Sequence, residues 1–230
     1  MKISPHPQQT IEWMQARAGI PTASEFDNLV SPTGEVRKGK MPTTYLNQKL
    51  AEWWIGGPLA SLNVFDMEQG RILEEEAIPW YELTYGIAIK RVGLITDNDE
   101  MIGCSPDGLI EVDGLDSGIE IKCPAIHTHI GYLLNNRLPD EYIHQVQGSM
   151  LVTGRDEWRF VSYRRKLPAL VLTVSRDPQY IGALHEALEL FLDRFVRGKK
   201  RLCELNDGPP KRFQHSAPKP QPAFVSETPS

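Results

Sequence analysis

The stretch GLIEVDGLDSGIEIK, residues 108–122, decides the fold. Two short runs of alternating apolar residues flank a Gly- and Asp-rich segment, which predicts two β-strands joined by a turn near residues 113–117. Because successive side chains of a strand point to opposite faces, Glu120 and Lys122 share one face of the second strand. The opposite face is predicted to enter an apolar layer through Ile119, Ile121 and Cys123.

Regular patterns continue on both sides of this hairpin. Apolar spacing and capping residues predict helices at residues 10–18, from residue 22, and at 44–56, 66–85, 139–154 and 177–205. The expected N-caps of three of these helices are Thr10, Asp66 and Asp140. Short β-branched runs predict further strands at residues 87–95, 100–105, 157–165 and 169–176. This order is typical of an α/β fold with a central mixed β-sheet flanked by helices.

The C-terminal end of the chain has a different composition. Six prolines follow Gly208, and no apolar periodicity remains there. Such a segment cannot bury enough apolar surface to offset the entropy lost on ordering it. We therefore expect a single domain at residues 1–207 and a disordered, proline-rich tail at residues 208–230.

Composition argues against several classes of protein. No apolar run approaches the roughly 20 residues that span a bilayer, and the N-terminus lacks the apolar core of a secretion signal. The three cysteines show no CxxC spacing, which argues against a disulfide scaffold and favours a reducing cytoplasm. A net charge of -5 argues against a surface that coats nucleic acid, although a local basic groove beside an acidic site is compatible with it.

A second short stretch, CSPDGL at residues 104–109, places an acid at the start of the hairpin. Folding the hairpin brings Asp107 beside Glu120 and Lys122 at the edge of a buried sheet. Carboxylate oxygens suit a hard cation such as Mg²⁺, and the backbone carbonyl of Ile121 offers a further ligand. Lys122 would then orient or deprotonate a water, or stabilise the negative charge that develops on a phosphate under attack. The alternative is a surface hairpin with a Glu–Lys pair, which is common and weak.

Two more polar residues lie on apolar helix faces. In the helix at residues 66–85, Glu74 shares a stripe with apolar residues, whereas the two glutamates that follow it face solvent. Gln147 shares the apolar side of the helix at 139–154. Glu74 would assist a metal-bound water, and Gln147 would hold the attacking water or a phosphate oxygen. The alternatives are a solvated glutamate face and an ordinary hydrogen-bonding core glutamine.

The segment RAGIPTASE, residues 17–25, combines an arginine with a helix start. Arg17 ends one helix, and a Gly-Ile-Pro turn leads to the next, where Thr22 and Glu25 have the spacing of a capping box. Unpaired N–H groups and the hydroxyls of Thr22 and Ser24 beside an arginine make a cradle for a phosphate. The alternative is a plain capping box with a surface arginine.

Five blocks of the chain occur in the order found in a known family. They are EWMQARAGIPTASEF (12–26), GRILEEEA (70–77), CSPDGL (104–109), EIKCP (120–124) and HQVQGSM (144–150). Together they resemble the phage lambda exonuclease family, also called the YqaJ-like viral recombinases, within the PD-(D/E)xK nuclease superfamily. The resemblance spans about residues 11–175 and implies a restriction-endonuclease-like core.

The resemblance also implies an activity and a setting. It implies a 5′→3′ exonuclease that digests one strand of double-stranded DNA from its ends, releases 5′-mononucleotides and leaves a 3′ single-stranded overhang. It implies dependence on Mg²⁺ or Mn²⁺ with about two ions per site, a ring-shaped homotrimer, and a single-strand annealing protein as partner in recombination. The expected location is the cytoplasm of a bacterial or phage-infected cell.

The resemblance assigns roles to residues by motif position. Metal binding falls to Asp107, Glu120 and the carbonyl of Ile121, handling of the nucleophilic water to Lys122, and support to Glu74 and Gln147. A pocket for the 5′-phosphate falls to Arg17, Ser24 and Ser105.

Two rival functions share parts of the pattern. A restriction-type or structure-selective DNA endonuclease would have the same catalytic cluster but would not need Arg17 and Ser24 as sensors of a strand end. A non-catalytic DNA-binding module would need no catalytic cluster. A preference for 5′-phosphorylated ends favours the exonuclease, whereas EDTA-insensitive DNA binding without digestion favours the module.

Overall fold

The computed structural model describes residues 1–59, 64–112 and 114–210, and the side chains of residues 64–72, 74 and 115 fall outside that description. Most of the tail predicted to be disordered, from residue 211 onward, therefore lies outside the described residues. Across the described ranges, no helix has the length and apolarity needed to cross a bilayer.

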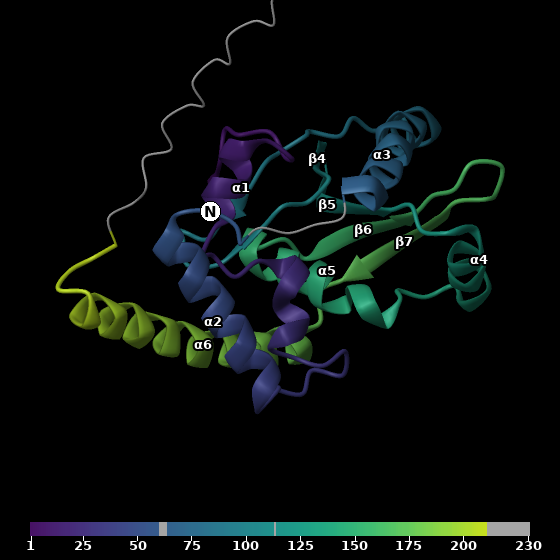
Figure 1. The fold of residues 1–230 in the computed structure, drawn as a ribbon. Helices are drawn as coiled ribbons and strands as arrows, with labels where there is room; N and C mark the ends of the chain where they lie inside the picture. Colours follow the sequence, from purple (N-terminus) through teal and green to yellow (C-terminus); the bar gives the residue numbers. More distant parts are fainter. Residues whose placement is uncertain (60–63, 113, 211–230) are drawn as a thin grey trace, which may run out of the picture.

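A four-stranded mixed sheet lies at the centre of the fold (Figure 1). Its strands, in spatial order, are β4 (Gly108–Val112), β5 (Leu115–Lys122), β6 (Glu157–Ser162) and β7 (Leu170–Ser175). Strands β5 and β6 run parallel, whereas the other two neighbouring pairs are antiparallel. The structure therefore confirms the predicted fold class, a mixed sheet flanked by helices.

The predicted hairpin at residues 108–122 forms between β4 and β5. Val112 already pairs with Leu115, so β5 begins inside the segment that the sequence predicts as a turn. The predicted apolar layer on one face of β5 is present, because a single buried cluster contains or contacts Ile119, Ile121 and Cys123.

Helices cover both faces of the sheet. Helix α3 (Val64–Tyr85) packs on one face, where Ala77 joins the cluster formed by the isoleucines of β5. Helix α5 (Asp140–Thr153) packs on the other face, where Met150 meets Phe160 of β6. The face of β5 that carries the charged residues is the one covered by α5.

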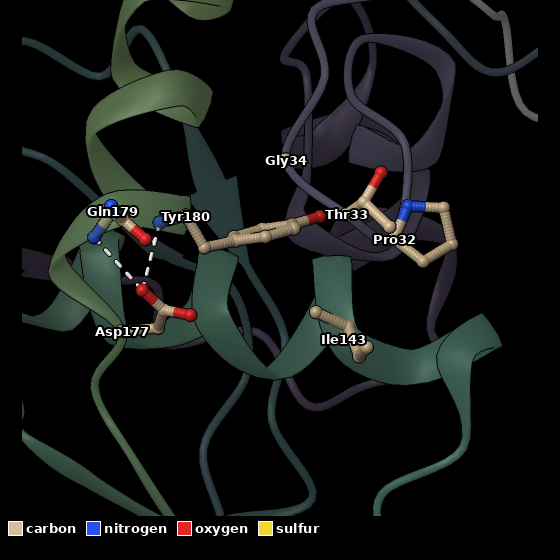
Figure 2. Close-up of a pocket in the computed structure, with 7 residues that line it drawn as sticks. All are labelled: Pro32, Thr33, Gly34, Ile143, Asp177, Gln179 and Tyr180. Carbon is tan, nitrogen blue, oxygen red and sulfur yellow. Dashed lines mark hydrogen bonds between the residues drawn. The ribbon is translucent and has the colours of Figure 1, made fainter.

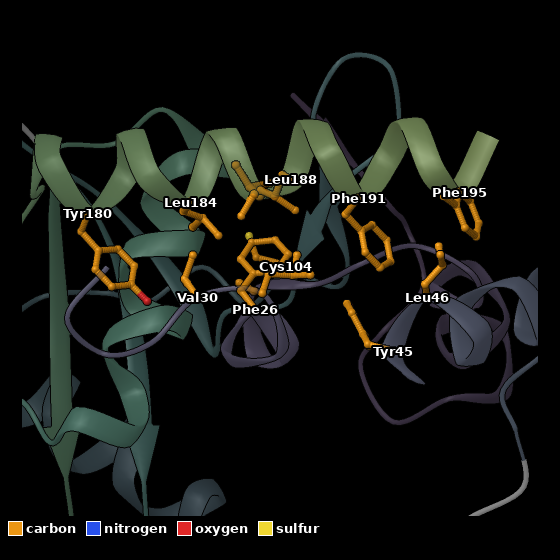
Figure 3. Packing of buried hydrophobic residues seen from close by; sticks show 14 of the residues in the cluster. Phe26, Val30, Tyr45, Leu46, Cys104, Tyr180, Leu184, Leu188, Phe191 and Phe195 are labelled. Carbon is orange, nitrogen blue, oxygen red and sulfur yellow. The ribbon is translucent and has the colours of Figure 1, made fainter. Parts of the chain in front are cut away.

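A second core lies beside the sheet, under helix α6 (Pro178–Leu205). One stripe of α6 faces this core through Tyr180, Leu184, Leu188, Phe191 and Phe195 (Figure 3). The elements packed against the stripe include the 3₁₀-helix η1 (Ala23–Asn28), helix α2 (Lys40–Ile55) and a small sheet of β1 (Lys2–Ile3), β2 (Ile95–Thr96) and β3 (Gly103–Cys104). This core holds the N-terminal segments beside the edge of the main sheet.

Several N-termini of helices differ from the predicted ones. The cap of α1 (Ile11–Arg17) is as predicted, since the Thr10 hydroxyl accepts from the Trp13 N–H. Helix α3 begins at Val64, so Asp66 lies within it and is not its cap. Helix α5 has Pro139 as its N-cap residue, which leaves Asp140 in the first turn, where its charge complements the positive helix end.

Other elements differ in length or existence. Helix α2 begins at Lys40 instead of residue 44, with Pro42 in its first turn, where a missing N–H breaks no hydrogen bond. The strands predicted at 87–95 and 100–105 shrink to the short β2 and β3. Helix α4 (Ile126–Asn135) was not predicted.

Candidate active site

The end of the β4–β5 hairpin brings charged residues together. Strand β4 begins at Gly108, opposite Ile119, so Asp107 lies next to the part of β5 that β4 does not cover. The Asp107 N–H donates to the Ile119 carbonyl at 3.1 Å, and the Ile121 N–H donates to Asp107 Oδ2 at 2.6 Å. The side chain of Asp107 thus replaces a strand partner at this edge.

Glu120 is the most buried member of this cluster. Its side chain is 4% exposed and lies on the face of β5 covered by α5. Its Oε1 accepts from Lys122 Nζ at 2.6 Å and from Gln145 Nε2 at 2.6 Å. Tyr142 closes the same side, because its ring centroid lies 5.0 Å from Lys122 Nζ. One carboxylate oxygen is therefore fixed by a strand neighbour and by a helix.

Lys122 carries a positive charge in this arrangement. Burial of the ammonium disfavours the charge, but the attraction of Glu120 and Asp107 outweighs burial and raises the pKa of Lys122 above its ordinary value. The side chain is therefore protonated at neutral pH. In this form it donates hydrogen bonds and stabilises negative charge.

The second oxygen of Glu120 has the character of a metal ligand. Glu120 Oε2 is buried and has no hydrogen-bond partner among the described residues, which is a costly state for a carboxylate oxygen. The carbonyl of Ile121 points to the same side of β5 as its N–H, which is toward Asp107. These oxygens fit a hard divalent cation such as Mg²⁺ or Mn²⁺.

The third predicted carboxylate cannot be placed. Glu74 belongs to α3, but its side chain lies outside the described residues. Within the described ranges, His, Cys, Asp and Glu side chains form no group of three or more that would hold a metal ion. Glu76, predicted to face solvent, is instead partly buried, accepts from the Tyr163 hydroxyl at 2.6 Å and pairs with Arg165. The described ligands of the candidate site are thus two carboxylates and a carbonyl.

Gln147 lies away from this cluster, contrary to its predicted catalytic role. It is 4% exposed, its Nε2 donates to the Ser175 carbonyl at 3.0 Å, and its Oε1 accepts from the Asp177 N–H at 2.9 Å. Gln147 is therefore the hydrogen-bonding core glutamine of the alternative interpretation. It ties α5 to the connection between β7 and α6.

Gln145, which the sequence analysis did not single out, contacts Glu120 in place of Gln147. Two residues along a helix differ by about 200° in direction, so two glutamines at this spacing cannot share a face. The spacing from Tyr142 could have indicated Gln145, because residues three apart lie on the same face of a helix. Tyr142 and Gln145 both reach the Glu120–Lys122 pair.

The residues predicted to bind a phosphate form a second cluster. Arg17 donates from Nη2 to Thr22 Oγ1 at 3.0 Å and to Ser24 Oγ at 3.4 Å. Its guanidinium carbon lies 4.4 Å from the centroid of the Trp13 ring. Burial lowers the pKa of Arg17 below its ordinary value, and the nearby Glu25 opposes that shift, so the cation persists at neutral pH.

A short segment of chain joins this phosphate cradle to the charged cluster. Trp13 Nε1 donates to Ser105 Oγ at 3.2 Å, which brings the third predicted phosphate ligand to the side of Arg17. The Gly103 N–H donates to the Pro21 carbonyl at 3.0 Å. Because Asp107 follows Ser105 by two residues, the cradle and the candidate metal ligands adjoin each other.

A separate hollow of about 400 Å³ lies between the loop at residues 32–34, α5 and the start of α6 (Figure 2). Figure 2 shows the ring of Tyr180 extending toward Thr33, and Asp177 accepting from the N–H groups of Gln179 and Tyr180. None of the predicted site residues lines this hollow. It is therefore distinct from the candidate active site.

Comparisons with known proteins show the family of the chain. The family model described as the YqaJ-like viral recombinase domain matches residues 12–156. The crystal structure of an alkaline exonuclease, LHK-Exo, from Laribacter hongkongensis is 30% identical, with a TM-score of 0.75 over 86% of this chain and 98% of that one. The structure of LHK-Exo in complex with dAMP is also 30% identical, with a TM-score of 0.74 over the same shares of the two chains, 86% and 98%.

A more distant structure shares the fold. A phage-related exonuclease from Haemophilus somnus 129PT is 17% identical, with a TM-score of 0.62 over 80% of this chain and 96% of that one. None of the curated proteins matches the chain. The family match covers both residue clusters, and on this basis the chain belongs to the YqaJ-like viral recombinase domain family, a family of nucleases that act on DNA.

Proposed function

We propose that this protein is a Mg²⁺- or Mn²⁺-dependent exonuclease that digests one strand of double-stranded DNA from its 5′ end. One observation carries the proposal: the cradle of Arg17, Ser24 and Ser105 adjoins the Asp107–Glu120–Lys122 cluster. An endonuclease needs the second of these clusters but has no use for the first. A cation-lined cradle beside a hydrolytic site fits a substrate that ends in a phosphate.

The charged cluster supplies the chemistry. Asp107, Glu120 and the Ile121 carbonyl would hold one or two divalent cations, which supply Lewis-acid chemistry at a phosphodiester. Protonated Lys122 would stabilise the negative charge that grows on the phosphorus during attack by water. Gln145 holds the Glu120 carboxylate in one orientation, because its amide donates to Oε1 and leaves Oε2 for the cation.

The proposed direction of digestion follows from the 5′-phosphate that the cradle would hold, and the bond that breaks restores this phosphate. Water attacks the phosphorus, the bond to the 3′ oxygen breaks, and the first nucleotide leaves as a 5′-mononucleotide. The shortened strand keeps a 5′-phosphate, so the end that Arg17 would bind is regenerated in every cycle. The uncut strand becomes a 3′ overhang. A deoxynucleoside monophosphate, dAMP, is the ligand in one LHK-Exo structure, which is consistent with such a product.

The partners are also proposals. Family membership supports a role in recombination, in which a single-strand annealing protein would take up the 3′ overhang. A ring of three chains would keep the enzyme on the duplex. Both features rest on the family resemblance, and size measurement and co-purification test them separately from the chemistry.

Digestion of end-labelled duplexes tests the proposed function. The substrates are a 5′-phosphorylated duplex, its 5′-hydroxyl counterpart and a nicked circle, each with Mg²⁺ and with EDTA, and Lys122→Ala is the inactive control. We expect a 5′ label to be released as a mononucleotide, a 3′ label to remain on progressively shorter strands, a preference for the phosphorylated end, and no digestion in EDTA. Cleavage at internal sites without end preference would establish the endonuclease, and EDTA-insensitive binding without products would establish a non-catalytic module.

A further inference from the structure

A buried lysine lies behind the phosphate cradle. Lys49 of α2 is 4% exposed, and its Nζ lies 2.9 Å from Glu25 Oε2 and 3.0 Å from Glu52 Oε2. Lysine is rarely buried to this extent without partners, because the desolvated ammonium is costly. An apolar residue of the same size usually replaces a buried ion pair without loss of stability. The position of Lys49 therefore calls for an explanation other than stability.

Glu25 connects Lys49 to the cradle. Its Oε2 accepts from Thr22 Oγ1 at 2.9 Å and from the Tyr45 hydroxyl at 3.3 Å, in addition to Lys49. The Thr22 hydroxyl has one proton and donates it to Glu25, so its oxygen is left to accept from Arg17 Nη2 at 3.0 Å. A chain of contacts thus runs from the lysine through a carboxylate and a hydroxyl to the guanidinium.

Glu52 connects Lys49 to the turn that follows Arg17. The Gly19 N–H donates to Glu52 Oε2 at 3.0 Å. Gly19 has φ +78° and packs so closely that an added Cβ would lie 2.8 Å from the Trp53 Cβ, so the turn admits only glycine. Lys49 therefore holds two carboxylates, one beneath Thr22 and one beneath Gly19, on either side of the Ile20–Pro21 step.

Charge explains why a cation is needed there. Without Lys49, the partly exposed Glu25 carboxylate beside Tyr45 would keep Arg17 as a cation that it attracts. A direct Glu25–Arg17 pair would occupy the N–H groups that the cradle offers to a phosphate and would cancel their charge. An uncompensated carboxylate behind the cradle would also repel the phosphate itself.

We infer that Lys49 is a positioning residue for the strand end: a buried counter-charge that holds Glu25 and, through Thr22, keeps Arg17 directed toward a 5′-phosphate. The inference rests on the proposed role of Arg17. It assigns to Lys49 an effect on end selection and none on bond cleavage, since Lys49 contacts neither Glu120 nor Lys122.

The test compares kcat/KM for 5′-phosphorylated and 5′-hydroxyl duplexes in the full-length protein. Lys49→Met keeps an unbranched side chain that is one atom shorter, and it removes the charge. We expect the ratio of the two kcat/KM values to fall roughly 10- to 100-fold, the range typical when a partner that supports a site residue is removed. A loss of structure alone would lower both values together and leave the ratio unchanged.

Two further variants sharpen the test. Lys49→Met combined with Glu25→Gln has no uncompensated charge beneath Thr22, and the glutamine carbonyl still accepts from Thr22, so the ratio should recover. Glu25→Leu removes the acceptor of the Thr22 proton while Lys49 keeps Glu52, so the ratio should fall as in Lys49→Met. Should Lys49→Met fail to fold, the ratio measured for Glu25→Leu provides the test. Lys2→Met, which removes an exposed lysine paired with Glu100, is the matched control and should behave as wild type.

Arg17→Ala separates this inference from the proposed function. If Arg17→Ala leaves the wild-type ratio intact, the phosphate cradle itself is wrong. If Arg17→Ala brings the ratio to about one while Lys49→Met and Glu25→Leu both keep the wild-type ratio, the proposed phosphate cradle stands. The positioning role of Lys49 is then overturned.

Discussion

Gln145 and Glu120 join helix α5 to strand β5 through a hydrogen bond of 2.6 Å between Nε2 and Oε1. The contact fixes one oxygen of a carboxylate whose other oxygen is buried and has no partner among the described residues. A side chain held this way has one orientation, and that orientation presents Oε2 as a ligand. The glutamine two residues further along α5 has an entirely different set of partners.

The two glutamines should therefore respond differently to substitution. Gln145→Leu should lower kcat roughly 10- to 100-fold with little change in the midpoint of thermal unfolding, because it removes a partner of a site carboxylate. Gln147→Leu should reduce the free energy of unfolding by about 1–3 kcal/mol, because it leaves the Asp177 N–H and the Ser175 carbonyl without their partner. Initial rates and urea unfolding curves measure both effects. The opposite pattern would return the catalytic role to Gln147.

Cation binding should depend on Glu120. Mn²⁺ should raise the unfolding midpoint of the wild-type protein, because a ligand that binds only the folded state stabilises it by about 2.7 kcal/mol at a concentration 100 times its Kd. Glu120→Gln should abolish this increase, since a neutral amide is a poor ligand for a hard cation. EDTA should reverse the increase in the wild type. Thermal unfolding with and without Mn²⁺ measures the effect without requiring activity.

Glu111→Gln is the matched control for Glu120→Gln. Glu111 lies on β4, next to β5, and pairs with the exposed Lys90 and with the buried Arg155, which also pairs with Asp116. Its substitution removes a carboxylate of the same hairpin and should leave the Mn²⁺ effect intact. A Mn²⁺-induced increase that survives Glu120→Gln would place the cation elsewhere in the protein.

The hairpin was predictable because its signals are local and agree with one another. Two alternating runs, a Gly- and Asp-rich turn and an acid just before the first strand fix the relative positions of Asp107 and Glu120, whatever packs around them. The grouping of Arg17 with Ser24 was predictable for the same reason, since a single turn separates them. The contacts of Asp107 with β5 lie within one hairpin register, and that of Arg17 with Ser24 spans a few residues.

The features that were missed depend on tertiary contacts. Helix α4 has few local signals, and it is held by His129, whose ring nitrogens contact Ser162 Oγ at 2.7 Å and the Pro168 carbonyl at 2.9 Å. Both partners lie more than 30 residues away, at the end of β6 and in the loop beyond it. Gln147 was misassigned because a buried amide on an apolar stripe has the same pattern whether its partner is a backbone carbonyl or a substrate.

Two helical glycines should respond to alanine with opposite signs. An added Cβ at Gly148 of α5 would lie 2.6 Å from the Phe26 ring of η1, which is fully buried and cannot move aside. Gly148→Ala should therefore destabilise the protein, because overpacking costs about 1–3 kcal/mol and exceeds the gain in helix propensity. Gly131 of α4 has nothing within 4 Å of an added Cβ, so Gly131→Ala should stabilise by roughly 0.5–1 kcal/mol.

Urea unfolding of both glycine variants provides the measurement. Because the contact between α5 and η1 also positions Ser24 near α5, Gly148→Ala should weaken the preference for phosphorylated ends as well. Equal stabilisation by both substitutions would mean that α5 and η1 are packed less closely than the structure has them.

Acid should destabilise the protein through His144. Burial lowers the pKa of His144 below its ordinary value of 6.5, and the attraction of Asp27 opposes this only in part. Below about pH 6.5 the unfolded chain takes up a proton that the folded chain does not, so the free energy of unfolding falls as pH drops through this range. The neutral ring keeps its Nε2–H for the Ser24 carbonyl at 3.3 Å.

Unfolding curves at about pH 7.5 and about pH 5.5 measure this linkage. His144→Gln keeps a donor for the Ser24 carbonyl but cannot be protonated in this range, so it should lose less stability on acidification than the wild type. His185→Gln, which replaces an exposed histidine on α6, should keep the wild-type slope. If His144→Gln and wild type lose stability in parallel, the proton is taken up elsewhere, and His144 is charged in the folded protein. Its contact with the Ser24 carbonyl would then be a charged hydrogen bond next to the cradle, strengthened and not broken by acid.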